Sequence, residues 1–224
     1  MKNKLILALA LTCLVGSAAY AAPVQGDEKL MKGMAAADIA VTKKVNALPA
    51  ISIGSGTKIL GPAEATQEQM VTYIKRHNPS PKLHCTVEQL VGYYYEEGSD
   101  EGVRPDVALC QALLETGFFA YGRDVDPVQN NYCGLGTTGK GQPGAYFATA
   151  QRGVRAHIQH LLGYATTRKP DKKLIDPRYD VLRQKYPRYY GHIPYWTGLN
   201  GKWALPGNNY GETILRYWHE AKNV

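Results

Sequence analysis

The pattern of apolar and polar residues predicts a chain built mainly of helices. Its clearest stretch follows Thr86, where Val87, Leu90, Val91 and Tyr94 stand at i, i+3, i+4 and i+7. This spacing places apolar side chains on one face of a helix. Strict alternation of apolar and polar residues, which is typical of a half-buried strand, is scarce along the chain. The predicted fold class is therefore mainly α.

Threonine, proline and glycine mark the ends of the predicted helices. Thr66 and Thr86 are each followed three residues later by Gln, a capping box that opens a helix. Pro105 fits the first position of a third helix, and Gly117 fits a left-handed stop just after it. The five predicted helices follow Thr66, follow Thr86, run from Pro105 to about Thr116, and cover residues 148–166 and 210–221.

The N-terminal region has a different pattern from the rest. Lys2 and Lys4 precede an apolar run over residues 5–15, and residues 19–21 read Ala-Tyr-Ala, which has the form of a signal-peptide cleavage site. We predict a signal peptide over residues 1–21 and export to the periplasm, the cell wall or the outside of the cell. An uncleaved N-terminal anchor is the alternative, and no later segment is apolar enough to span a membrane.

The stretch between the predicted signal peptide and the first helix looks like a linker. Residues 22–65 lack sustained periodicity and are rich in Ala, Gly and Pro, a composition typical of flexible connections. The remaining residues, 66–224, have the size of one ordinary domain. The predicted order is thus signal peptide, linker and a single helical domain that contains a long Gly-rich loop over residues 118–147.

The charge of the chain favours an anionic partner. The formal net charge is +7, and removal of residues 1–21 takes two lysines and no acid, which leaves +5. Such a surplus suits cell-wall polymers or membrane surfaces. The basic stretches 172–173 and 183–188 are too sparse to indicate a nucleic-acid partner. The 16 Tyr against 3 Phe indicate aromatic faces that also form hydrogen bonds.

Cysteine and histidine spacing points to no metal or cofactor. Three cysteines follow the predicted signal peptide, namely Cys85, Cys110 and Cys133, so one internal disulfide at most is possible. Cys110 with Cys133 would brace the loop against the third helix, and the other pairings are equally open. No C-x-x-C is present, and His157 and His160 have no carboxylate or Cys near them in the sequence.

The strongest candidate for catalysis is Glu115. It is the only acidic residue between Asp106 and Asp124, and it lies at the end of an apolar predicted helix beside two Phe. Burial and the negative end of the helix dipole are both expected to raise the pKa of a carboxyl group there. A raised pKa is what a general acid needs to hold its proton near neutral pH.

Several segments around Glu115 carry a family resemblance. They are residues 111–119 (QALLETGFF), 124–132 (DVDPVQNNY), 134–136 (GLG), 153–161 (GVRAHIQHL), 176–179 (DPRY) and 199–207 (LNGKWALPG). In this order they resemble the glucosaminidase family, glycoside hydrolase family 73, over about residues 68–218. The resemblance implies a lysozyme-like, two-lobed mainly α domain with a groove. It also implies cleavage of the β-1,4 bond after N-acetylglucosamine in peptidoglycan, with Glu115 as the catalytic acid.

The second catalytic group is left open by the sequence. Many glycosidases pair the acid with another carboxylate, yet no Asp or Glu occurs from Pro127 to Pro170. Asp124 and Asp126 are the candidates from the protein. Alternatively the 2-acetamido group of the substrate attacks the anomeric carbon, or Glu115 acts as both acid and base and yields an anhydro sugar, as in lytic transglycosylases.

Sugar rings stack on aromatic side chains, and amides hydrogen-bond N-acetyl groups. The resemblance adds an aromatic residue in a C-terminal motif, for which Trp203 is the nearest match and Tyr210 the next. The predicted substrate-binding residues are Asn130, Asn131, Tyr132, Tyr146, Tyr195, Trp196, Trp203 and Tyr210.

Other classes of function remain as alternatives at this point. A muramidase or lytic transglycosylase would act on the same glycan. A wall-binding module would hold the glycan without cleaving it. A cysteine peptidase or amidase would use Cys133 with His157 or His160, although no helix begins directly after Cys133 to lower the pKa of its thiol. The chain is predicted to act as a monomer.

Overall fold

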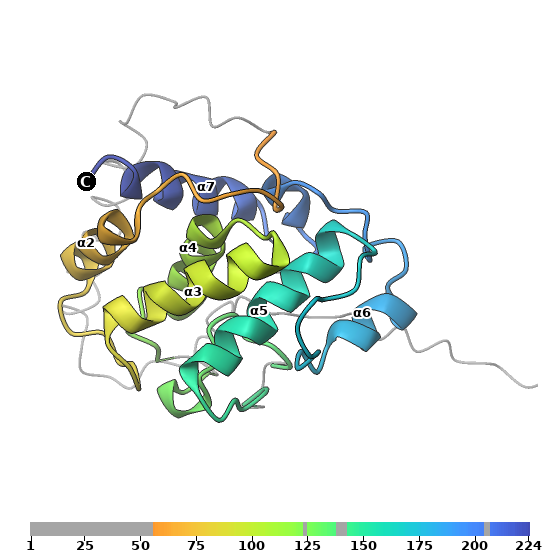
Figure 1. Cartoon of the computed structure of the whole chain (residues 1–224), viewed down its shortest axis with the longest axis horizontal. Coiled ribbons are helices and arrows are strands. Elements are labelled where there is room, and N and C mark those ends of the chain that lie inside the picture. Colours follow the sequence, from red (N-terminus) through yellow and green to blue (C-terminus); the bar gives the residue numbers. More distant parts are fainter. Residues whose placement is uncertain (1–55, 123–124, 138–142, 204–206) are drawn as a thin grey trace, which may run out of the picture. The chain divides into compact units, whose positions relative to one another are not determined.

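Helices make up most of the part of the chain that the structure describes. The computed structural model describes residues 56–122, 125–137, 143–203 and 207–224 (Figure 1). The α-helices in these ranges are α2 (Gln67–His77), α3 (Val87–Glu101), α4 (Pro105–Thr116), α5 (Ala150–Ala165), α6 (Tyr179–Lys185) and α7 (Tyr210–Ala221), and the 3-10 helices are η1 (Pro127–Gln129) and η2 (Trp196–Leu199). Within the described ranges only isolated β-bridges occur, so the mainly α prediction is confirmed.

The predicted helix ends are formed as the sequence indicated. Thr66 and Thr86 each accept a hydrogen bond from the backbone of the Gln three residues on, and the Gln side chain bonds back to the backbone of the Thr. Gly117 follows α4 with φ +58°, a left-handed conformation that glycine adopts at little cost. Helix α6 was not predicted, because it has seven residues and no side-chain N-cap.

The helices pack around α4, which is buried along most of its length. Helix α3 packs against α5 on one side and α4 on another, and α7 packs against α4 and η2 (Figure 1). Gly98 allows the close approach of α3 to the start of α4, since a Cβ atom there would lie 2.7 Å from the Cβ of Pro105. Tight packing of this kind fixes the axis of α4 and therefore the direction of its last turn.

A buried ion pair ties α3 to α5 near the solvent side of their contact. Glu97 is fully buried, and Arg155 donates to both of its carboxylate oxygens at 2.9 Å. Lys172 lies 3.1 Å from the same carboxylate. Burial by itself raises the pKa of Glu97, but Arg155 and Lys172 outweigh it, so the pKa of Glu97 is lowered.

The predicted linker boundary at residue 65 is wrong, because residues 57–65 belong to the folded unit. Ile59 is fully buried; its amide donates to the carbonyl of Pro194, and its carbonyl accepts from the amide of Arg104, both at 2.8 Å. Lys58 and Leu60 form β-bridges with Tyr195 and Val103. A short extended segment held mainly through its backbone carries no periodic signal, which explains the error.

Asp106 holds this segment to α4 and α7. Its carboxylate is fully buried and accepts the amides of Glu64 and Ala65 at 2.8 and 2.9 Å. The indole of Trp218, in α7, donates to the same oxygen at 2.6 Å. One side chain therefore satisfies three donors from two separate parts of the chain, as expected for a buried carboxylate.

Some sequence predictions fall outside the described residues or are changed by the structure. The predicted signal peptide and residues 22–55 lie outside the described ranges. Cys85 and Cys110 are free thiols, so the bridge from Cys110 to Cys133 is not formed. In the ranges that the structure covers, no helix is both long enough and apolar enough to cross a membrane.

Candidate active site

The candidate acid stands on the last turn of α4, where the helix leaves the core. Glu115 is half-exposed, whereas Thr116 and most earlier residues of α4 are buried. Gln111 lies one turn earlier, at i−4, so both side chains share one face of the helix. The last turn of α4 thus presents the carboxylate of Glu115 toward solvent, and the buried amide of Gln111 lies one helical turn before it.

The chain turns sharply after Glu115 through residues in an unusual conformation. Gly117, Phe118 and Phe119 have φ values of +58°, +54° and +61°, and aromatic residues seldom adopt this left-handed region. The Thr116 hydroxyl bonds to the carbonyl of Ala112 and accepts the amide of Phe119, at 2.7 and 3.0 Å. Strained backbone held by such contacts is concentrated at functional sites.

A continuous chain of hydrogen bonds leads from the protein interior to Glu115. The hydroxyl of Tyr210 donates to Oε1 of Glu115, and Nε2 of Gln111 donates to the Tyr210 hydroxyl at 2.7 Å. On its other side, Oε1 of Gln111 lies 2.9 Å from Nε2 of His157. Nδ1 of His157 lies 2.9 Å from the hydroxyl of Tyr94. Tyr94, Gln111 and His157 are fully buried, and Tyr210 is nearly so.

The chemistry of these groups gives the chain a direction. An ionised Glu115 only accepts, so Tyr210 donates to it, and Gln111 must donate to Tyr210 through its amide nitrogen. The amide oxygen of Gln111 then faces His157, which places the ring proton on Nε2 and leaves Nδ1 to accept from Tyr94. Burial, with a smaller effect of His160, lowers the pKa of His157 to about 3. The ring is therefore neutral, as this arrangement requires.

Tyr210 is held in place by the first turn of α7. Asn200 accepts the amide of Gly211 at 2.7 Å and donates to the carboxylate of Glu212 at 2.8 Å. A Cβ atom at Gly211 would lie 2.4 Å from the carbonyl oxygen of Trp196. The start of α7 is thus fixed against η2, and the phenol that reaches Glu115 is fixed with it.

Of the predicted substrate-binding residues, the two asparagines and Tyr132 hold the loop that follows Glu115. Asn131 is fully buried; it accepts the amide of Leu135 and donates to its carbonyl, both at 2.9 Å. Asn130 donates to the carbonyl of Phe147 at 2.9 Å. The ring of Tyr132 is buried against Tyr94 and Phe119. These three side chains therefore hold the backbone of the loop in place and do not form an exposed sugar-binding surface.

The predicted aromatic residues divide into exposed and buried groups. Tyr146 and Tyr195 are 61% and 39% exposed and so present ring surface to solvent. Trp196 is fully buried, and Trp203 packs among His157, His160 and Tyr164. Of the predicted aromatic residues, Tyr210 is the one whose side chain is bonded to Glu115.

The candidate second carboxylates lie in the loop after α4. Asp126 caps η1: its side chain accepts the amide of Val128 at 3.0 Å, and its backbone amide donates to the side-chain oxygen of Gln129 at 2.6 Å. Asp124 lies outside the described residues. Asp126 therefore has a structural function whether or not it takes part in chemistry.

The two histidines on α5 serve different parts of the structure. His157 belongs to the chain that ends at Glu115, whereas Nδ1 of His160 lies 2.8 Å from the carboxylate of Asp176. No group of three or more His, Cys, Asp or Glu side chains in the described ranges is arranged to hold a metal ion. His160 and Asp176 together attach the segment before α6 to α5.

Gln111, His157 and Tyr94 support Glu115 through hydrogen bonds, a role that the sequence analysis did not give them. The spacing of Gln111 and Glu115 is a signal that the sequence does carry, since residues four apart on a helix are neighbours. His157 and Tyr94 are 46 and 63 residues from their partners in the chain. No local pattern brings them together before the packing of α3, α4 and α5 is known.

Gly153 offers a test of how tightly the loop is seated on α5. A Cβ atom at this position would lie 1.8 Å from the carbonyl oxygen of Asn130. Gly153→Ala is expected to displace the loop and lower the free energy of unfolding by about 1–3 kcal/mol, which corresponds to a fall in Tm of roughly 3–10 °C. Differential scanning calorimetry measures this change.

The matched control is Gly92→Ala on α3. The nearest atom to a Cβ there is the Gln67 side-chain oxygen, 4.0 Å away, so only helix propensity changes, and it changes favourably. The expected Tm of this variant is equal to or above that of the natural chain. A Gly153→Ala variant that was as stable as Gly92→Ala would contradict the close contact.

Comparison with known proteins identifies a related family. The family described as glucosaminidase, mannosyl-glycoprotein endo-beta-N-acetylglucosaminidase, matches residues 91–223. These residues include Tyr94, Gln111, Glu115, His157 and Tyr210. A Borreliella burgdorferi protein described as uncharacterized is 33% identical over 137 residues, which cover 61% of this chain and 64% of that protein. The chain thus spans less than two thirds of this relative. No solved structure gives a significant match.

Proposed function

We propose that this chain, which belongs to the glucosaminidase family, hydrolyses the β-1,4 bond after N-acetylglucosamine in the glycan strands of peptidoglycan, with Glu115 as the general acid. Family membership supports a glycoside hydrolase. The choice of peptidoglycan rests on the predicted export of the chain and on its basic charge. We further propose that it acts as a monomer outside the cytoplasm, in the periplasm, at the cell wall or beyond.

The observation that carries the proposal is the position of Glu115. The side chain of Glu115 is half-exposed at the end of a buried helix, and its Oε1 accepts a hydrogen bond from the hydroxyl of Tyr210. A carboxyl group held in this way at the solvent side of α4 is in position to give a proton to a glycosidic oxygen.

In the proposed reaction Glu115 supplies the proton and the substrate supplies the first nucleophile. As the bond between C1 and the leaving oxygen breaks, Glu115 donates its proton to that oxygen, and the carbonyl oxygen of the 2-acetamido group bonds to C1. The carboxylate of Glu115 then takes a proton from the water molecule that attacks C1 and opens the oxazolinium ring. The N-acetylglucosamine product keeps its configuration, and Glu115 regains its proton.

Two observations favour this route over one with a second protein carboxylate. No Asp or Glu occurs from Pro127 to Pro170, and Asp126 is exposed and engaged in capping η1. The route through the acetamido group needs a single acid from the protein, which is what the described part of the site provides. Mutation of Asp126 to Asn is therefore expected to preserve most of the activity.

Mass spectrometry of products from purified sacculi tests the proposed function. New reducing ends on N-acetylglucosamine are the expected result. Reducing-end N-acetylmuramic acid would show a muramidase, an anhydro sugar would show a lytic transglycosylase, and released peptides would show a peptidase or amidase. Binding to sacculi without any new product would show a module that only holds glycan. Each of these four outcomes would overturn the proposal.

Removal of the phenol that orients Glu115 gives a prediction about rate. Tyr210→Phe removes a hydrogen bond to a charged group, which is worth about 1.5–3 kcal/mol, and kcat is expected to fall roughly 10- to 100-fold. KM should change little, because the bond orients the acid rather than holding the sugar. Steady-state kinetics on solubilised glycan strands separates the two constants.

Tyr217→Phe on the same helix is the matched control. The ring of Tyr217 packs against Phe118 and Tyr73, so loss of its hydroxyl should leave kcat near that of the natural chain. Equal kcat in the two variants would mean that the phenol of Tyr210 does not orient the acid.

A further inference from the structure

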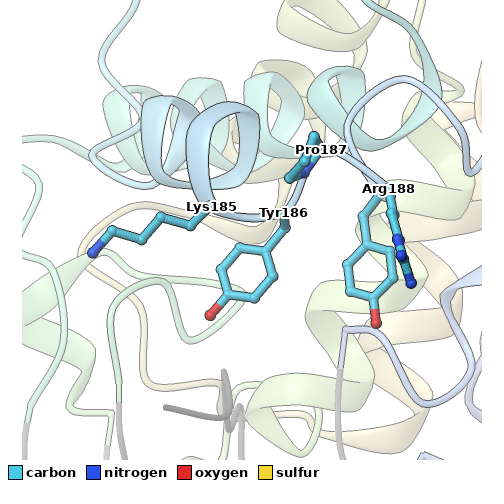
Figure 2. Close-up of a pocket in the computed structure, with 5 residues that line it drawn as sticks. Lys185, Tyr186, Pro187 and Arg188 are labelled. Atoms are coloured by element: carbon cyan, nitrogen blue, oxygen red, sulfur yellow. The ribbon is translucent and has the colours of Figure 1, made fainter. Parts of the chain in front are cut away.

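A pocket lies outside the hydrogen-bond chain of Glu115, at the turn that follows α6. It has a volume of about 230 Å³ and is lined by Lys185, Tyr186, Pro187, Arg188 and Tyr189. Figure 2 shows the side chains of Tyr186 and Arg188 extending in the same general direction from this turn, with Lys185 reaching out to one side. The volume is below the roughly 300–1,000 Å³ of sites for drug-sized ligands, so the pocket suits one small ring or group.

Two of the lining residues form a parallel aromatic pair. The rings of Tyr186 and Tyr189 are inclined by only 9°, with centroids 6.1 Å apart, and both side chains are half-exposed. Among the described residues neither phenol hydroxyl has a hydrogen-bond partner, in contrast to Tyr94 and Tyr210. The pair therefore offers ring faces together with two uncommitted hydroxyl groups, which is a suitable surface for a sugar.

The same pocket carries two positive charges. Lys185 and Arg188 are exposed, and no carboxylate of the described ranges pairs with either. Two other cations differ in this respect: Arg183 of α6 pairs with Asp180, and Lys172 pairs with Asp100. These two unpaired cations in a basic chain leave the pocket open to an anionic group.

We propose that the pocket at residues 185–189 is a binding site for a sugar that carries a carboxylate. The sugar ring lies against Tyr186 and Tyr189, and its carboxylate pairs with Arg188 and Lys185, a combination that neither a neutral sugar nor a free acid satisfies. The wider assignment, that this sugar is part of a peptidoglycan strand, rests on the proposed function. In such a strand N-acetylmuramic acid is the sugar whose lactyl ether supplies a carboxyl group.

A pair of monosaccharides that differ by this one group provides the test. N-acetylmuramic acid and N-acetylglucosamine are titrated separately into the full chain, and the side-chain NMR signals of Tyr186 and Tyr189 are followed. Monosaccharides bind weakly, with Kd on the order of 1 mM. The acidic sugar is expected to shift both tyrosine signals, with an affinity that falls as salt screens the ion pairs. The neutral sugar is expected to bind several-fold more weakly.

Charge variants separate the pocket from general attraction to a basic protein. The double variant Lys185→Gln with Arg188→Gln is expected to bind N-acetylmuramic acid roughly tenfold more weakly and to lose the preference over N-acetylglucosamine. Lys173→Gln with Arg183→Gln removes the same charge from residues that do not line the pocket, and it should keep the preference. Tyr186→Ala should weaken the binding of the acidic sugar at unchanged charge.

Three results would overturn the proposal. They are equal binding of the two sugars, equal shifts caused by lactate alone, and an equal loss of affinity in both double variants. Product analysis on sacculi is run on the same proteins. A natural chain that releases no sugar product refutes the proposed function but leaves the titrations interpretable, whereas an active chain without the preference refutes the pocket alone.

Discussion

Glu115→Gln is expected to lower kcat for glycan cleavage by about 10³-fold or more, near the upper part of the range for loss of a general acid. The amide has no proton to give at neutral pH, so the leaving oxygen departs unprotonated. Its oxygen still accepts from Tyr210, so the hydrogen-bond chain and the turn at Gly117 remain intact. Release of reducing sugar from purified sacculi measures the loss.

The control for this variant is Glu68→Gln, which makes the same chemical change at an exposed position in the first turn of α2. Its activity should equal that of the natural chain. Circular dichroism and Tm should be alike for all three proteins, which separates chemistry from folding. If Glu115→Gln retained near-natural activity, Glu115 would not be the acid, and the mechanism proposed here would fail.

The second large effect concerns stability and pH, and it arises from His157. The pKa of this buried ring is about 3 in the folded protein, against about 6.5 in an unfolded chain. Between these values the unfolded chain binds a proton that the folded protein does not. Lowering the pH from 6.5 toward 3 therefore favours unfolding, by about 1.4 kcal/mol per pH unit from this residue alone.

His157→Gln removes this proton linkage together with the hydrogen bonds of the ring. At pH 7 the variant should be less stable than the natural chain, because Tyr94 and Gln111 lose their fixed partner. The difference should shrink by about 3 kcal/mol between pH 6.5 and pH 4, since only the natural chain loses the contribution of His157. His160 and Asp176 are present in both proteins, so their effects cancel to first order.

Urea denaturation across this pH range measures the difference directly. A difference in unfolding free energy that stayed constant from pH 7 to pH 4 would mean that His157 titrates normally in the folded state. It would then also be free to carry a charge, and the one-way hydrogen-bond chain to Glu115 would lose its basis.

The parts of the fold that follow from local chemistry were predictable from the sequence. Capping boxes at Thr66 and Thr86 and the glycine after Thr116 depend on residues within a few positions, and all three occur as expected. The candidate acid was found in the same way, from one carboxyl group at the end of an apolar helix. Its supporting amide, Gln111, also lies within one helical turn.

The remainder of the candidate site depends on contacts between distant parts of the chain. The bond from Tyr210 to Glu115 joins residues 95 positions apart, and it exists because α7 packs against α4 and η2. For Asn131 the sequence suggested contact with sugar, whereas its amide is used entirely inside its own loop. An asparagine side chain can either bind a sugar or hold a loop, and only the residues around it show which of the two it does.

The anchoring of residues 64 and 65 by Asp106 has a practical consequence for where the chain is cut. A truncated protein that started at residue 66, where the periodic pattern begins, would lack the two amides that donate to the buried carboxylate of Asp106. It would also lack Ile59, whose side chain is fully buried in the core. The smallest fragment worth expressing therefore starts upstream of Thr57. A protease that removes residues from the N-terminal side should stop before Thr57, because the β-bridges at Lys58 and Leu60 protect the peptide bonds that follow.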